Sequence, residues 1–325
     1  MPTQAIDARN PRWPAETKPV SGVVYVATGA AYVQEARDAT VRLRKFNPGL
    51  PVCLVTDQPS EPAFWDELVL IENPHFGFRD KVLMGLCPFE RFLFLDTDTT
   101  VLADIAELFE LLSRFDFAGH QLFEGHDCPV EGIPDAFPEF NTGVLGFRRS
   151  PALSGFFQAW LANYDAFYAL NRDGNYHYSN ASDQKSLRKT VYESGLRIAI
   201  LGPEFNFTPH HVDFACGQVR ILHSRGWSHI GELSARLNAR VGNRAYVPRL
   251  DVVVSNDMPA SELLRLWWMS SLQIFRQAAV RLTPLGLRDR LRGSAWIRRL
   301  FLRNRFIEPT PALDSKWHRS SAKDE

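Results

Sequence analysis

The first hundred residues alternate short apolar runs with segments of helical spacing, and this alternation constrains the fold more than any other feature. VVYVA and VCLVT flank residues 30–46, whose apolar positions recur along one helix face. A third strand over residues 67–71 and a helix over 80–86 lead to RFLFLD, an apolar run expected to be buried on both faces. The pattern predicts an α/β fold with a parallel sheet and flanking helices.

The composition argues against several classes of protein. The 325 residues include 37 basic and 37 acidic side chains, so the zero net charge argues against a protein that binds nucleic acid over its whole surface. The four cysteines lie far apart without a CxxC pair, which disfavours a zinc ribbon or a disulfide framework and favours a reducing, cytoplasmic compartment. No uninterrupted apolar run reaches about 18 residues, so we expect no membrane-spanning helix.

Shifts in composition divide the chain into four parts. Residues 1–20 lack an apolar signal-peptide core and are expected to form a disordered lead, followed by one catalytic domain over 21–255. The segment 260–307 carries ten arginines and two acidic residues among apolar residues at helical intervals, and predicts a basic amphipathic extension. Residues 308–325 are polar and expected to be disordered.

The strongest chemical signal is FLFLDTDTTV, in which a buried strand delivers Asp96 and Asp98 at its carboxyl end. Ligands of open α/β sheets bind at that edge, and two carboxylates suit a hard divalent cation. Three interpretations remain open on this motif alone. The pair could cap a helix, Asp96 could be the nucleophile of a DxDxT phosphatase of the haloacid-dehalogenase type, or the motif could be the DxD of a nucleotide-sugar transferase.

The surroundings of the motif favour the transferase. Haloacid-dehalogenase-like phosphatases carry DxDxT on their first core strand, whereas three predicted strands precede it here, and neither an Asp-Asp pair nor GDxxxD follows. Other segments come in the order YVATGAAY, GFRDKVLMG, FNTGVLGF, SDQKSL and VRILHSRGW. With these landmarks, residues 23–227 resemble the glycogenin-like and galactinol-synthase-like retaining glycosyltransferases. That resemblance implies a GT-A fold, which is Rossmann-like with a mixed, mainly parallel sheet.

The resemblance also implies a nucleotide-diphosphate site. Thr28 would lie near the base, Tyr32 would offer an aromatic face to uracil, and Lys81 would face the donor phosphates. Arg225 would contact the diphosphate. Taken alone, Lys81 fits a solvated helix position equally well.

Metal and sugar ligands follow from the same resemblance. Asp96, Asp98 and His223 would hold Mn²⁺ (or Mg²⁺), and the imidazole nitrogen favours manganese. Asn141 would touch the donor sugar, and Asp183 and Gln184 would lie beside it. Each has a simpler interpretation: Asn141 lies in a turn sequence, Asp183 suits a helix start, and a lone histidine after an apolar run is usually a core residue.

The implied activity is metal-dependent transfer of a sugar from a UDP-sugar to a glycan or lipid-linked acceptor, with retention. Departures from the family pattern at Gly29 and Asn180 leave the donor sugar open, and Glu72 stands where some relatives carry an arginine. A non-catalytic relative that binds nucleotide-sugars is an alternative, besides the phosphatase. The basic extension predicts a peripheral contact with an anionic membrane surface, and its alternative is packing on the catalytic domain.

Overall fold

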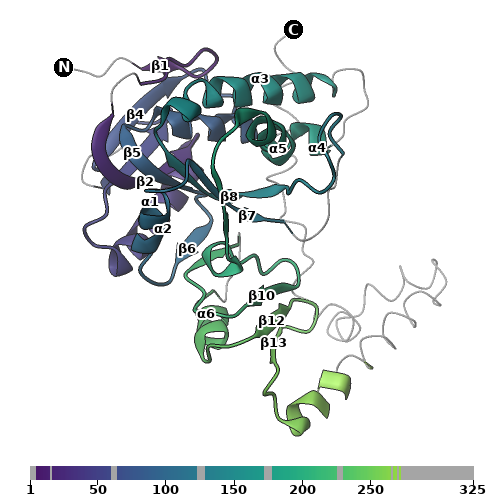
Figure 1. Cartoon of the computed structure of the whole chain (residues 1–325). Helices are drawn as coiled ribbons and strands as arrows, with labels where there is room; N and C mark the ends of the chain where they lie inside the picture. Colours follow the sequence, from purple (N-terminus) through teal and green to yellow (C-terminus); the bar gives the residue numbers. More distant parts are fainter. Residues whose placement is uncertain are drawn as a thin grey trace, which may run out of the picture. The chain divides into compact units, whose positions relative to one another are not determined.

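The structure is a computed structural model that describes residues 5–14, 17–59, 64–122, 129–171, 178–224, 230–264, 266–268 and 271. The chain divides into two compact units (Figure 1). The first comprises residues 1–208 and 218–227, and the second comprises 209–217 and the residues from 228 onward. The range 21–255, which the sequence predicted as one domain, is therefore divided between the two units.

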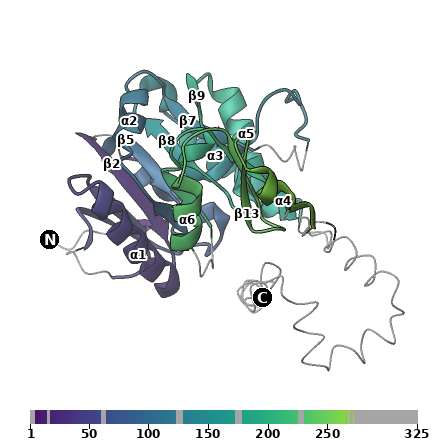
Figure 2. The ribbon, with the colours of Figure 1, turned by 90° about the horizontal axis from the view of Figure 1, so that it is seen from below.

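The first unit is built on an eight-stranded sheet. In spatial order, its strands are β1 (Ile6–Asp7), β4 (Glu67–Glu72), β3 (Val52–Thr56), β2 (Lys18–Ala27), β5 (Phe89–Leu95), β8 (Phe140–Arg148), β7 (Phe117–Gln121) and β9 (Ile198–Leu201). Every neighbouring pair is parallel except the two that involve β8. Figure 2 shows β2, β5, β8, β7 and β9 in this order. The predicted α/β fold with a mixed, mainly parallel sheet is confirmed.

Helices cover both faces of this sheet (Figure 1). They are α1 (Ala30–Phe46), η2 (Phe78–Leu86), α2 (Ala106–Leu111), η3 (Pro151–Leu153), α3 (Phe156–Ala169), α4 (Tyr178–Ala181), α5 (Asp183–Ser194) and η4 (Pro203–Phe205). Alternate side chains of each strand enter different cores. In β5, Leu93 and Leu95 pack with α1 and α2, whereas Phe92 and Phe94 pack with η2, α3 and α5. Asp96 continues the alternation of Phe92 and Phe94, so its side chain points to the same face of the sheet, toward η2 and α5.

Residues 5–14 and 17–20 are more ordered than the composition of this segment predicted. Residues 1–20 were expected to be a disordered lead, but Ile6 and Asp7 form β1, which pairs in parallel with β4. Ala8 is fully buried in the same core as β5, and β2 already begins at Lys18. A single two-residue edge strand leaves no hydrophobic periodicity in the sequence, which is why the pattern did not reveal it.

A two-stranded antiparallel sheet adjoins the end of β5. It pairs β6 (Thr99–Val101) with β11 (Ile221–His223), and places His223 opposite Thr99. The pairing joins two segments more than a hundred residues apart, immediately after Asp98. It therefore fixes His223 beside the DxD motif.

The second unit has its own small core. An antiparallel sheet of β10 (Asp213–Ala215), β12 (Arg244–Val247) and β13 (Val252–Ser255) accompanies α6 (Ile230–Asn238). Leu233, Leu237 and Tyr246 are fully buried there. Residues 260–264 and 266–268 are helical, whereas most of the predicted extension 260–307 and all of 308–325 lie outside the described residues. No helix among the described residues is both long and apolar enough to cross a membrane.

Candidate functional site

Asp96 and Asp98 lie in a tight turn between β5 and β6. The backbone N–H of Asp96 still donates to the carbonyl of Gly143 on β8 at 2.9 Å, so the sheet positions the first aspartate. The backbone N–H and the hydroxyl of Thr99 both donate to the Asp96 carbonyl, at 3.0 and 2.8 Å. The turn thus brings both carboxylates to the carboxyl edge of the sheet. Thr97, between them, donates its hydroxyl to Glu35 on α1 at 2.8 Å.

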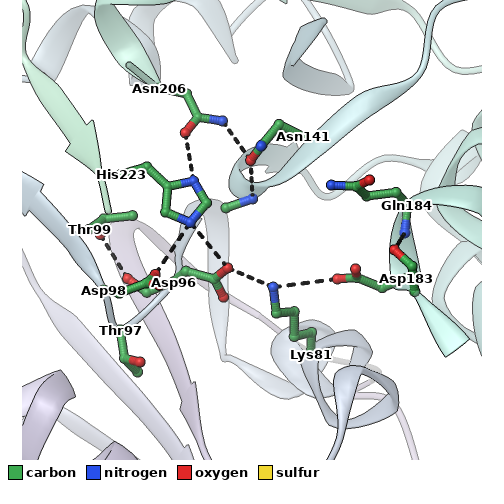
Figure 3. Close-up of polar contacts among 12 residues, drawn as sticks. Lys81, Asp96, Thr97, Asp98, Thr99, Asn141, Asp183, Gln184, Asn206 and His223 are labelled. Atoms are coloured by element: carbon green, nitrogen blue, oxygen red, sulfur yellow. Dashed lines mark hydrogen bonds and ion pairs between the residues drawn. The ribbon is translucent and has the colours of Figure 1, made fainter. Parts of the chain in front are cut away.

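His223 completes a three-residue cluster with these aspartates (Figure 3). Its Nε2 lies 3.3 Å from Oδ1 of Asp98 and 3.7 Å from Oδ2 of Asp96. One ligand atom from each of the three residues lies within 4.8 Å of the others. Two carboxylate oxygens and one imidazole nitrogen form a donor set that suits a borderline cation such as Mn²⁺.

The electrostatics of the cluster also favour a cation. Burial raises the pKa of Asp96, and the negative charge of Asp98 adds to this effect while Lys81 opposes it. Burial alone would lower the pKa of His223, but the hydrogen bond and charge of Asp98 outweigh it and raise that pKa. The cluster therefore concentrates negative charge that a bound cation would neutralise, and the residues present fit a divalent metal.

Gly143 makes room for the imidazole. A Cβ atom at this position would lie 2.0 Å from Cε1 and 2.2 Å from Nδ1 of His223. No side chain fits at such distances, so the histidine ring packs directly against the backbone of β8. This close approach gives a physical reason for the glycine in the FNTGVLGF segment.

Asn206 sets the orientation of His223 through a chain of hydrogen bonds (Figure 3). The backbone N–H of Gly143 donates to Oδ1 of Asn141 at 2.8 Å, which identifies this oxygen as an acceptor. Nδ2 of Asn206 donates to the same oxygen at 3.0 Å, so Oδ1 of Asn206 must face Nδ1 of His223, 3.1 Å away. An amide oxygen only accepts, hence Nδ1 carries a proton and Nε2 faces the aspartates. There Nε2 hydrogen-bonds to Asp98 while it is protonated, and could bind a cation through its lone pair once that proton is lost.

Lys81 reaches the cluster from η2. Its Nζ donates to Oδ2 of Asp96 at 2.6 Å and lies 3.5 Å from Oδ2 of Asp183. Burial alone would lower the pKa of this ammonium group, but the charges of Asp183 and Asp96 outweigh it and raise the pKa. Lys81 is therefore a cation held between two carboxylates and not a solvated helix residue.

Asp183 and Gln184 begin α5, as the sequence predicted. The hydroxyl of Ser182 accepts from the N–H of Gln184 at 3.3 Å and caps the helix. Asp183 is almost fully buried and faces Lys81, whereas Gln184 is partly exposed (Figure 3). Because the Asn141 oxygen has two protein donors, a ligand would meet this side chain through Nδ2.

The predicted base-binding residues Thr28 and Tyr32 lie around the end of β2. Gly29, with φ of 89°, separates them at the start of α1, and its N–H donates to Asp57 at 2.7 Å. Thr28 is nearly buried and hydrogen-bonds to the carboxylate of Asp80. Tyr32 is partly buried against the core under α1. Arg225 lies outside the described residues.

Sequence reasoning missed three polar residues of this region, Asp57, Asp80 and Asn206. Asp57 directly follows VCLVT, so its position at a strand end was a signal that could have revealed it. Asp80 and Asn206 act on partners from other elements, and nothing in their local sequence indicates this.

Comparisons with known proteins return distant structural similarities only. No family model and no curated protein matches the sequence. A solved structure of the galactosyltransferase LgtC with donor and acceptor sugar analogues is similar at 15% identity and a TM-score of 0.48, over 67% of this chain and 95% of that one. Mouse xyloside xylosyltransferase 1 gives 17% identity and a TM-score of 0.41, over 64% of this chain and 98% of that one.

A third similar structure is the glycosyltransferase GlyE of Streptococcus pneumoniae TIGR4, at 17% identity and a TM-score of 0.45. It is matched over 77% of this chain and 64% of that one. All three TM-scores are below 0.5, so the functional assignment depends on the geometry of this chain's own site.

Proposed function

We propose that this chain is a metal-dependent glycosyltransferase of GT-A type that transfers a sugar from a UDP-sugar to a glycan or lipid-linked acceptor, with retention. The observation that carries the proposal is the cluster of Asp96, Asp98 and His223, whose ligand atoms lie within 4.8 Å of one another beside Lys81. These groups suit a cation and a diphosphate at the ligand-binding edge of the sheet.

The three clustered residues would hold Mn²⁺ or Mg²⁺, and that metal would supply charge neutralisation for the diphosphate of the donor. Lys81 adds a permanent positive charge on the side of Asp183. A fixed cation that faces the bridging phosphate oxygen stabilises the charge of a departing UDP more than that of the intact donor. Lys81 is thus expected to act on the rate of bond cleavage.

The donor sugar would lie between Asn141 and the start of α5. Nδ2 of Asn141 can donate to a sugar hydroxyl, because the oxygen of that amide is already used within the protein. The carboxylate of Asp183 is paired with Lys81, which links the sugar side of the site to the phosphate side. Retention would involve Asp183, Gln184 or attack from the face that UDP leaves.

An acceptor at a membrane surface is supported by the start of the C-terminal extension. Leu263, Leu264, Trp267 and Trp268 are between 50% and 63% exposed, and a sequence rich in arginine follows them. Exposed tryptophans and leucines next to basic residues suit an interface with anionic lipid. We therefore include a peripheral membrane contact in the proposal.

The test combines binding and turnover. Isothermal titration should show UDP binding that requires Mn²⁺, and a panel of UDP-sugars should give UDP release. Asp98→Ala and His223→Ala should each abolish Mn²⁺-dependent binding and keep a cooperative thermal transition. The matched controls are Asp135→Ala and His211→Ala, at exposed positions of the same residue types.

Other outcomes identify the alternatives. UDP binding without release of UDP from any donor would indicate a non-catalytic relative. Release of phosphate from a phosphomonoester that depends on Asp96 and not on UDP would indicate the phosphatase and contradict the proposal.

A further inference from the structure

Asp80 is a buried carboxylate next to Lys81 whose role the catalytic proposal does not use. It is 2% exposed and accepts hydrogen bonds from the backbone N–H groups of His75 at 2.9 Å and Phe76 at 2.7 Å. The hydroxyl of Thr28 also hydrogen-bonds to it. One side chain therefore connects three points of two different segments.

These contacts do not cap a helix. An acid at a helix start accepts from N–H groups that follow it, whereas both backbone donors to Asp80 precede η2. The carboxylate instead fixes the loop of residues 73–77 that connects β4 to η2. Its pairing with Thr28 then attaches this loop to the end of β2.

The loop has an unusual backbone. Phe76 has φ of 56° and Asn73 has φ of 55°, both in the left-handed region that a bulky residue such as phenylalanine rarely adopts. Such a conformation persists only where the surroundings enforce it, and it concentrates at ligand sites. Here the hydrogen bond from the Phe76 N–H to Asp80 enforces it.

The loop lies at the same edge of the sheet as the candidate site. β4 and β2 are in the same parallel sheet, so the residues that follow them lie at the same edge as Asp96. His75 packs edge-on against Tyr168 of α3, with ring centroids 5.2 Å apart, which anchors one side of the loop. The Phe76 ring remains 44% exposed although its backbone is fixed.

We propose that Asp80 is a positioning residue that holds Phe76 and Thr28 in place so that the Phe76 ring forms a preformed wall for the nucleoside of the donor. This inference rests on the proposed function, because it assumes a nucleotide ligand. The shared contact with Thr28, and not with the metal cluster, indicates the nucleoside as the part that the loop meets. An aromatic ring held beside a base contributes stacking energy without an ordering cost when the ligand binds.

Asp80→Asn tests the positioning role. The amide keeps the size of the side chain but replaces one acceptor oxygen with a donor. The side chain can then no longer accept hydrogen bonds from the N–H groups of both His75 and Phe76. We expect the Kd of UDP in the presence of Mn²⁺ to rise about tenfold, whereas binding of Mn²⁺ alone should not change. Asp116→Asn is the matched control, because Asp116 is also buried and accepts a backbone N–H, but lies at the start of β7.

Phe76→Gly separates the ring from the backbone conformation. Glycine adopts positive φ without strain, so the variant should retain the backbone conformation of the loop. UDP binding should nevertheless weaken, by about fivefold or more, through loss of stacking. Phe76→Tyr should restore wild-type affinity because it retains an aromatic face.

The outcomes separate this inference from the function on which it rests. If wild-type protein binds UDP and Asp80→Asn and Phe76→Gly bind it equally well, Asp80 is merely structural and the inference is wrong. The same holds if Asp116→Asn weakens UDP binding as much as Asp80→Asn. If the wild type itself does not bind UDP with Mn²⁺, the proposed function fails first and the inference falls with it.

Discussion

The side-chain oxygen of Asn206 lies 3.1 Å from Nδ1 of His223 and determines which imidazole nitrogen faces the two aspartates. Asn206 is fully buried, and its amide group is fixed in turn by Asn141. Residues that orient a metal-binding histidine in this way tune the affinity for the metal without touching it.

Asn206→Ala should therefore weaken Mn²⁺ binding. Without the acceptor, the neutral imidazole can keep its proton at Nε2 or the ring can rotate, and the expected loss is about 10- to 100-fold in affinity. Titration of Mn²⁺ followed by electron paramagnetic resonance measures this directly. Asn206→Asp keeps an acceptor toward Nδ1 and should lose less. Asn163→Ala removes a comparable side-chain hydrogen bond on α3 and should leave Mn²⁺ affinity unchanged. Equal affinity in Asn206→Ala and wild type would contradict the assigned orientation.

Gly143→Ala should displace the His223 ring. The new methyl group would overlap the imidazole, so either the ring or β8 must move, at a cost of about 1–3 kcal/mol. We expect a lower midpoint of thermal unfolding together with loss of Mn²⁺ binding. Gly49→Ala, where an added Cβ would meet nothing within 4 Å, provides the control. A variant with wild-type Mn²⁺ affinity would show that the ring does not occupy this position.

Lys81→Met should have opposite effects on metal binding and on turnover. Lys81 donates to Asp96 at 2.6 Å and so competes with a cation for that carboxylate. Its removal should raise the affinity for Mn²⁺ alone by a few-fold, whereas the rate of UDP release should fall by about 100-fold or more. The comparison of kcat with the Kd of UDP checks whether the charge matters mainly as UDP departs. Lys185→Met, a change at a lysine of α5 paired with Asn180, is the control. An unchanged rate would remove Lys81 from the proposed chemistry.

The stability of the first unit should depend on pH through Asp116. Hydrogen bonds from Arg197, and next from Arg148, outweigh burial and hold the pKa of this carboxyl well below its usual range. A depressed folded-state pKa gives stability that is complete above the unfolded value of about 3.9 and is lost as the pH falls below it. Asp116→Asn should lower the free energy of unfolding at pH 7 by about 1–3 kcal/mol. In urea unfolding, the difference from the wild type should narrow below about pH 4. A difference that is constant down to pH 3 would contradict this assignment.

Local sequence patterns predicted the parallel half of the sheet and several helices closely. Residues 52–56 and the helix at Asp183–Ser194 match the observed β3 and α5. The direction of β8 and the pairing of β11 with β6 were not predictable, because they depend on partners distant in the chain and not on periodicity. The helix expected over 80–86 is part of the 3₁₀ helix η2, and the apolar spacing of so short a segment does not distinguish a 3₁₀ helix from an α-helix.

The candidate site likewise contains residues that the sequence indicated and residues that it did not. Asp96, Asp98, Lys81, Asp183 and His223 were selected from ordered motifs, and the structure brings them together. Their roles in binding and catalysis stay predictions. Asp80 and Asn206 were missed because each acts through hydrogen bonds to other segments, and a single sequence gives no sign of such partners.

The exposed aromatic residues at the start of the C-terminal extension lead to a prediction about lipid. Trp267 and Trp268 are 63% and 58% exposed, and the arginine-rich sequence after them would meet anionic headgroups while the indole rings enter the interface. The full-length protein should co-sediment with vesicles that contain phosphatidylglycerol, and added salt should weaken this binding because the arginines contribute by charge. Vesicles of phosphatidylcholine alone should bind less.

Replacement of both tryptophans by alanine should reduce binding about tenfold or more while Mn²⁺-dependent UDP binding stays at the wild-type level. Leu170→Ala removes an apolar side chain of similar exposure at the residue that follows α3 and should change neither property. Sedimentation that ignores lipid charge, or that is equal in the double variant and the wild type, would show that these tryptophans do not contact a membrane, and the lipid-linked acceptor would then lose its support in this chain.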